Sequence, residues 1–115
     1  MSDPDVARRA VLDSAGEDEY GLWEILAAVR SALPGRAEAE WRSLADGAVR
    51  GLAADGLVEL RRGRALDNDR AQVVSLDQLN ELRAWEPSGD EPSYLTLHIT
   101  PAGEQAYYAQ PPVDG

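Results

Sequence analysis

The chain has 115 residues, 43% of them apolar, which suits one domain with one modest hydrophobic core. It contains no cysteine, which excludes disulfides, thiolate zinc sites and thiol nucleophiles and fits a reducing compartment. With 11 basic and 21 acidic residues its net charge is −10, which disfavours a polyanionic partner such as DNA. The start of the chain lacks a basic-then-apolar signal pattern, and no apolar run approaches the roughly 20 residues that span a bilayer, so we expect a cytoplasmic protein with no membrane partner.

The charge is distributed unevenly along the chain. All eleven basic residues are arginine, which together with the abundant alanine and glycine indicates a high-GC bacterial origin. Residues 36–70 hold seven arginines and seven acids, residues 1–35 hold three arginines and seven acids, and residues 71–115 hold one arginine and seven acids. Any surface for an anionic partner therefore has to lie in the middle third of the chain.

Two helices are predicted at the start of the chain. Asp3 and Pro4 provide an N-cap and a proline at the first helical position, and this helix should end near Gly16. The second helix, over 20–32, has the cleanest amphipathic pattern, with one apolar face formed by Leu22, Ile25, Leu26, Val29 and Leu33. The dipeptide at 34–35, proline then glycine, is a stop signal.

A third, longer helix is predicted over 37–55. Gly47 and Gly51 lie one turn apart within it, and each weakens a helix by roughly 1 kcal/mol relative to alanine. Either another backbone approaches the helix at these glycines, or the helix kinks or breaks there. Gly56 fits the left-handed position that follows a helix end.

The second half of the chain predicts two strands with an insert between them. The first strand covers 57–62, and Ser75 caps an inserted helix over 76–85. Residues 94–99 alternate strictly, which predicts a strand with three side chains facing inward (Leu95, Leu97 and Ile99) and three facing outward (Tyr94, Thr96 and His98). Thr100 and the proline after it start a final helix, followed by a loose tail over 110–115.

The order helix, helix, helix, strand, insert, strand, helix resembles the winged helix-turn-helix domain of MarR-like and PadR-like repressors. Two junctions carry the resemblance: Asp55-Gly56-Leu57-Val58-Glu59, where recognition helix meets wing, and 97–103, where the return strand enters a dimerisation helix with the sequence Leu-His-Ile-Thr-Pro-Ala-Gly. The resemblance covers roughly 20–109. It implies one domain over 1–115, mainly α with a small antiparallel β-wing and an inserted helix in the wing. This scaffold serves DNA binding, dimerisation and protein docking alike.

The chain departs from the repressor pattern in two ways. About 30 residues separate the two wing strands, whereas the family's wing hairpin is short. The expected recognition helix also begins with Glu38 and Glu40 beside Arg36 and Arg42, and carboxylates at this place oppose the approach of phosphates.

The arginines of the middle third are the candidate nucleic-acid contacts. The helix over 37–55 and the wing over 57–70 would present them to phosphates and base edges: Arg36, Arg42, Arg50, Arg61, Arg62 and Arg64. The alternative is that they pair with nearby acids, which are as numerous and include Glu38, Asp46, Glu59, Asp67 and Asp69. The charge balance favours pairing.

The sequence predicts no enzymatic site, metal or cofactor. His98 is the one histidine, so it cannot form a multi-histidine site, and its place on a polar strand face predicts a solvated side chain. Asp67 and Asp69 offer oxygen ligands but lack the glycine and the distal glutamate of a calcium loop, so a turn explains them better. The sequence has no phosphate-cradling glycine loop and no nucleophile elbow.

Four aromatic residues are candidate contacts to a protein partner or to a second copy of the chain: Trp23, Trp85, Tyr107 and Tyr108. Adjacent tyrosines on one helix cannot both face the core, so we expect at least one to be available. The preferred function is a non-catalytic winged-helix interaction module that binds a protein partner or self-associates in a regulatory role. The alternative is a DNA-binding transcriptional regulator that uses the helix over 37–55 and the wing over 57–70.

Overall fold

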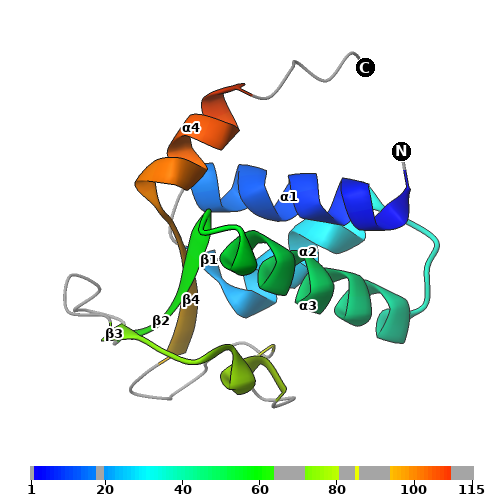
Figure 1. Cartoon of the computed structure of the whole chain (residues 1–115). Coiled ribbons are helices and arrows are strands. Elements are labelled where there is room, and N and C mark those ends of the chain that lie inside the picture. Colours follow the sequence, from blue (N-terminus) through cyan, green and yellow to red (C-terminus); the bar gives the residue numbers. More distant parts are fainter. Residues whose placement is uncertain (1, 18–19, 64–71, 81–84, 86–93, 110–115) are drawn as a thin grey trace.

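The computed structural model describes residues 2–17, 20–63, 72–80, 85 and 94–109. In these ranges four α-helices pack beside a small antiparallel sheet (Figure 1), which confirms the predicted mainly α fold with a small antiparallel β-wing. The elements are α1 (Asp3–Glu17), β1 (Tyr20–Gly21), α2 (Leu22–Ala32), α3 (Glu38–Ala54), β2 (Val58–Gly63), β3 (Gln72–Val73), the 3-10 helix η2 (Leu76–Asn80), β4 (Tyr94–Ile99) and α4 (Pro101–Ala109).

A capping box begins α1, but the cap is one residue earlier than predicted. Ser2 is the N-cap: its Oγ accepts a hydrogen bond from the Asp5 backbone N–H (3.4 Å) and donates one to the Asp5 carboxylate (2.8 Å). These hydrogen bonds favour the ionised carboxylate and lower the pKa of Asp5. The cap therefore stabilises the fold above the ordinary pKa of aspartate and is lost as the pH falls through the lowered value. Asp3, the predicted cap, binds Arg36 instead.

The second helix begins two residues later than its pattern predicts. Residues 20–21, expected to be helical, form β1 and pair with Thr96 and Leu97 of β4. Gly21 precedes the first turn of α2, and its N–H donates to Oε1 of Glu24 (3.1 Å), which fixes the start of the helix. The predicted apolar face is confirmed, since all five of its residues are buried: Leu22, Ile25, Leu26, Val29 and Leu33.

The third helix ends as predicted, with Gly56 in the left-handed region (φ 75°). The N–H of Gly56 donates to the carbonyl of Ala53 (3.0 Å), and the N–H of Leu57 donates to the carbonyl of Leu52 (2.9 Å), which together form a Schellman motif. This motif reverses the chain directly into β2. The helix runs without a break past Gly47 and Gly51, and neither glycine meets another backbone. The expected approach of another backbone and the expected break of the helix are therefore both wrong.

Gly47 offers a stabilising substitution. It lies on the exposed side of α3, and a Cβ added there would meet nothing within 4 Å. We expect Gly47→Ala to raise the free energy of unfolding by about 0.5–1 kcal/mol, because alanine has the higher helix propensity. Urea unfolding monitored by circular dichroism measures this. A Cβ at Gly51 would lie 3.3 Å from the Arg8 guanidinium, so Gly51→Ala should gain less, and an equal gain at both sites would contradict this account.

Strand β4 lies at the centre of the sheet, whose order is β1-β4-β2-β3 with antiparallel neighbours. Leu97 pairs with Leu60 of β2, and both side chains enter the hydrophobic core. Thr96 and His98 occupy the opposite face, where solvated side chains were predicted, but they are 0% and 5% exposed. A hydrogen bond of 2.8 Å joins Thr96 Oγ1 to His98 Nε2. The prediction was wrong because α1, α2 and α4 all contact β4, and a strict alternation in the sequence does not show that one face of a strand is left to solvent.

The described part of the insert contains β3 and the short 3-10 helix η2, not the α-helix that was predicted. The Oγ of Ser75 accepts a hydrogen bond from the N–H of Asp77 (3.2 Å), but Gln78 does not complete a capping box, because its side-chain oxygen accepts from Arg62 (3.0 Å). Leu79 and Trp85 are buried in the common core. Hydrogen bonds to Arg50 of α3 and Arg62 of β2 also hold the insert. Figure 1 shows its 3-10 helix in yellow-green below α3.

The last helix begins as predicted, at Thr100 and the proline that follows it. The N–H of Gly103 donates to Thr100 Oγ1 (3.0 Å), and that hydroxyl donates to the carbonyl of Gly56 (2.6 Å). The N–H of Thr100 also donates to the carbonyl of Leu57 (3.0 Å). One threonine therefore ties the start of α4 to the turn between α3 and β2.

Candidate functional site

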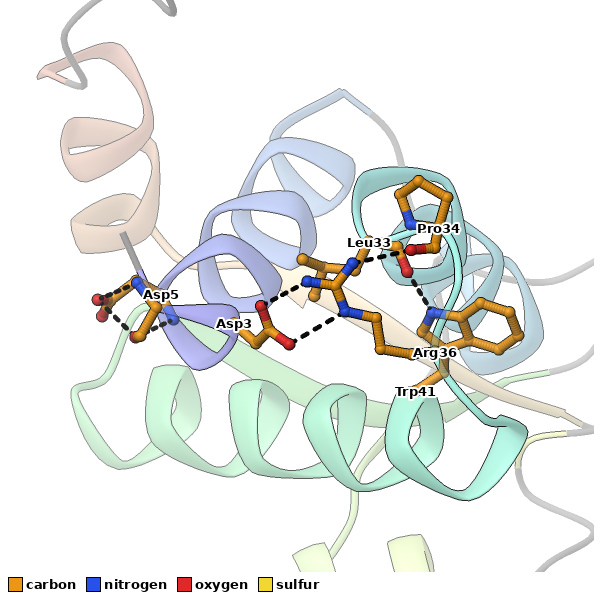
Figure 2. Close-up of polar contacts among 7 residues, drawn as sticks. Asp3, Asp5, Leu33, Pro34, Arg36 and Trp41 are labelled. Carbon is orange, nitrogen blue, oxygen red and sulfur yellow. Dashed lines mark hydrogen bonds and ion pairs between the residues drawn. The ribbon is translucent and has the colours of Figure 1, made fainter.

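Arg36, the first candidate nucleic-acid contact, is fully engaged within the chain. It follows the turn at Gly35, and its Nε and Nη2 donate to the two carboxylate oxygens of Asp3 (3.1 and 2.8 Å; Figure 2). Its Nη1 donates to the carbonyl of Pro34 (2.8 Å). The hydrogen bonds with Asp3 raise the pKa of Arg36. This two-pronged pair joins the α2–α3 turn to the start of α1 and leaves little of the guanidinium for a phosphate.

Further contacts fix the same turn at its other side. The indole N–H of Trp41 donates to the carbonyl of Leu33 (2.7 Å), as Figure 2 shows. Arg30 forms an ion pair with Glu38 and lies over the Trp41 ring, with 5.9 Å between the guanidinium carbon and the ring centroid. The start of the expected recognition helix is therefore held by charge pairs within the chain.

Two more arginines of the candidate set also pair with carboxylates. Arg50 Nε donates to both oxygens of Asp46 (3.1 and 3.0 Å), one helical turn away. Arg61 donates through Nε and Nη2 to Glu59 Oε2 (3.2 and 2.7 Å), two residues away on the same face of β2. The predicted pairing is thus present for Arg50 and Arg61, while Arg36 pairs with an acid that the sequence did not single out.

The three remaining arginines differ from these. Arg62 donates to the amide oxygen of Gln78 (3.0 Å), a neutral partner. Arg42 has no hydrogen-bond or ion-pair partner within the described ranges and is half-buried. Arg64 lies outside the described residues, as do the acids at 67 and 69. Only Arg42 and Arg62 of the described candidates therefore keep a charge that no carboxylate opposes.

The insert lies along the outward side of α3. A groove of about 390 Å³ runs between them, lined by Ala39, Arg42, Ser43, Asp46, Leu79, Asn80 and Trp85. Arg50 Nη2 bridges the two elements by donating to Oδ1 of Asn80 (2.8 Å). A recognition helix has to enter a major groove about 12 Å wide. The insert attached along α3 makes the body that would have to fit there wider than a single helix.

The aromatic candidates separate into core and surface residues. Trp85 is 4% exposed, and its indole N–H donates to the carbonyl of Leu79 (3.0 Å), so it belongs to the core and presents no surface to a partner. Tyr107 is half-buried and its ring covers Gly16 of α1. Tyr108 is 78% exposed and meets Tyr107 edge-to-face, with 5.2 Å between the ring centroids. Trp23 is 42% exposed.

Trp23 lies in a second groove, which the sequence did not predict. This groove has a volume of about 360 Å³. Two residues of α1 (Ser14 and Glu17) and five residues of α2 line it: Trp23, Glu24, Ala27, Ala28 and Ser31. Positions 23, 27 and 31 recur every fourth residue, so they form one helix face beside the buried face of α2. This spacing of a tryptophan with small residues was the signal available in the sequence.

The described residues offer neither a membrane-spanning helix nor a cluster of metal ligands. No helix of the described ranges is both long and apolar enough to cross a bilayer. Likewise, no three side chains of histidine, cysteine, aspartate or glutamate converge as metal ligands in the part of the chain that the structure describes.

The chain was also compared with known proteins. No protein-family model, no curated protein and no solved structure matches it. The resemblance to winged-helix repressors therefore rests on the sequence alone, and function has to be argued from the contacts, burial and charge of this chain.

Proposed function

We propose that the chain is a non-catalytic winged-helix interaction module that binds a protein partner in a regulatory role. The observation that carries the proposal is the engagement of Arg36, Arg50 and Arg61 by carboxylates of the same chain. These are half of the six arginines that a DNA-binding mode would use. The side chains of Trp23 on α2 and Tyr108 on α4 remain exposed, and tryptophan and tyrosine are enriched among residues that dominate protein interfaces.

The electrostatic argument against DNA follows from these pairs. Non-specific affinity for DNA comes from cationic groups that neutralise phosphates and release the counterions around them. An arginine and the carboxylate bound to it have no net charge together, so this pair releases few counterions from DNA. The remaining arginines act against a net charge of −10, which repels a polyanion at low salt.

Self-association is a second form of the same proposal. Tyr108 points away from the core near the end of α4, next to the half-buried Tyr107. A second copy that covers Tyr108 would form a homodimer through α4, which is where the repressor resemblance places a dimerisation helix. The mass in solution of Tyr108→Ala and of the unaltered chain, measured by light scattering, distinguishes a dimer through this residue from a monomer.

One observation favours the alternative, a DNA-binding transcriptional regulator. Arg42 on α3 and Arg62 on β2 have no carboxylate partner among the residues that the structure describes. Two such charges give only a weak contact with phosphates, because non-specific affinity grows with the number of phosphates that cationic groups neutralise.

Titration with random-sequence duplex DNA at low and rising salt tests the proposed function. We expect no binding by the unaltered chain even at low salt, where attraction is least screened. A control variant in which Asp46→Asn and Glu59→Gln release Arg50 and Arg61 should bind more tightly than the unaltered chain. Binding that weakens steeply with salt and is lost in the Arg61, Arg62 and Arg64 triple alanine variant would establish the DNA-binding regulator instead.

A further inference from the structure

The groove between α1 and α2 has the features of a protein-docking site for a cationic segment. We propose that it binds an arginine- or lysine-bearing segment of a partner protein, with Trp23 as the central contact. This inference rests on the proposed function and adds the chemistry of the partner and the place where it binds. Exposure, shape and charge support it separately.

Trp23 differs from the other two tryptophans in how its indole is used. The indole N–H groups of Trp41 and Trp85 donate to backbone carbonyls at 2.7 and 3.0 Å. Trp23 is 42% exposed, and its N–H has no acceptor within the described ranges. Its ring lies against Gly21, where an added Cβ would come within 3.2 Å of Cδ1 and Nε1. Trp23 therefore offers a pre-positioned apolar ring with an unused donor, and such residues anchor interfaces.

The residues beside Trp23 leave room for a partner side chain. Ala27, Ala28 and Ser31 continue along α2, and Ser14 faces them from α1. The hydroxyl of Ser14 is already bound to the carbonyl of Ala10 (2.9 Å). The result is a shelf of small side chains, about 360 Å³ in volume, beside an exposed ring. A long side chain from a partner can lie on this shelf while its end reaches the rim.

The charge of the rim determines which side chain fits. Glu17 and Glu24 line the groove, and none of the described residues that line it is basic. The surrounding segment, residues 1–35, carries three arginines against seven acids, and the whole chain has a net charge of −10. A guanidinium or ammonium group can meet the rim carboxylates and the face of the Trp23 ring together. An acidic peptide or a nucleic acid is repelled from the same place.

A pair of matched peptides tests the assignment. The first is a short peptide of leucine and arginine with both ends blocked, and the second has glutamate in place of every arginine. Isothermal titration calorimetry of the full chain should show binding of the arginine peptide and none of the glutamate peptide. Equal binding of both peptides, or no binding of the arginine peptide, overturns the proposal.

Variants locate the binding. Trp23→Ala should weaken the arginine peptide about tenfold or more, and Glu17→Gln about threefold. The matched control for Glu17→Gln is Glu104→Gln on α4, which should leave the affinity unchanged, since Glu104 is exposed outside the groove. Ala27→Arg, which places a positive charge on the exposed edge of the shelf, should abolish binding without altering the core.

The outcomes also separate this inference from the proposed function. If the arginine peptide binds Trp23→Ala and Ala27→Arg as tightly as the unaltered chain, the groove assignment is overturned, while a role in protein binding stands. If the DNA titration shows salt-sensitive binding through the wing arginines, the proposed function itself fails.

Discussion

Gly103→Ala is expected to destabilise the fold by about 3 kcal/mol or more, which is the largest effect of any alanine substitution at a described glycine. A Cβ at this position would lie 1.9 Å from the carbonyl oxygen of Leu57 and 2.7 Å from a side-chain carbon of Ile99. The backbone of α4 passes directly over the start of β2 there. Because the obstacle is backbone, relief requires α4 to move, and movement breaks the hydrogen bonds that Thr100 makes to Gly56 and Leu57.

Urea unfolding of Gly103→Ala, followed by circular dichroism, measures the effect. Gly47→Ala is the matched control, since it makes the same chemical change at an exposed site with open space and should stabilise the chain. If Gly103→Ala unfolds at the same urea concentration as the unaltered chain, α4 does not pack on the α3–β2 turn as described.

Trp85→Ala is expected to lower the free energy of unfolding by about 3–5 kcal/mol. The ring is 4% exposed within the core, and its N–H satisfies the carbonyl of Leu79, so truncation leaves a cavity and an unpaired acceptor. If the insert lay on the surface, the same substitution would change the free energy of unfolding by only about 0.5 kcal/mol. The prediction therefore tests whether the insert belongs to the core.

Two comparisons interpret the result. Trp85→Phe keeps most of the apolar contact and loses the hydrogen bond, so its destabilisation should be clearly smaller than that of alanine. Trp23→Ala removes an exposed ring and should change stability by less than 1 kcal/mol. Equal stabilities of Trp23→Ala and Trp85→Ala would show that Trp85 is a surface residue and that the insert is held by polar contacts alone.

The parts of the fold that could be predicted are those with a local signal. The apolar period of α2, the left-handed glycine after α3 and the threonine cap of α4 each involve residues within a few positions of one another. Predictions failed where the structure or burial of a residue depends on a partner that is far away in the sequence. Strand β1 forms because β4 lies beside it, and the burial of His98 depends on how elements far apart in the sequence pack around β4.

The candidate site divides in the same way. The pairs Asp46–Arg50 and Glu59–Arg61 join residues four and two positions apart and could be foreseen from the balance of charges. The pair between Arg36 and Asp3 spans 33 residues and depends on how α1 packs against the α2–α3 turn. The groove at Trp23 forms only where α1 packs against α2. The sequence therefore shows which residues of α2 share one face, but not that α1 completes a groove beside them.

Chemical-shift mapping of the full chain tests the central claim most directly. Backbone amide and tryptophan indole spectra would be recorded with the arginine peptide and, separately, with duplex DNA at low salt. We expect the peptide to shift the Trp23 indole and the amides of Ser14 and Ala28, and we expect DNA to shift no resonance. If DNA shifts the amides of Arg42 and Arg61 while the peptide leaves Trp23 unchanged, the chain is a DNA-binding protein and the account is contradicted.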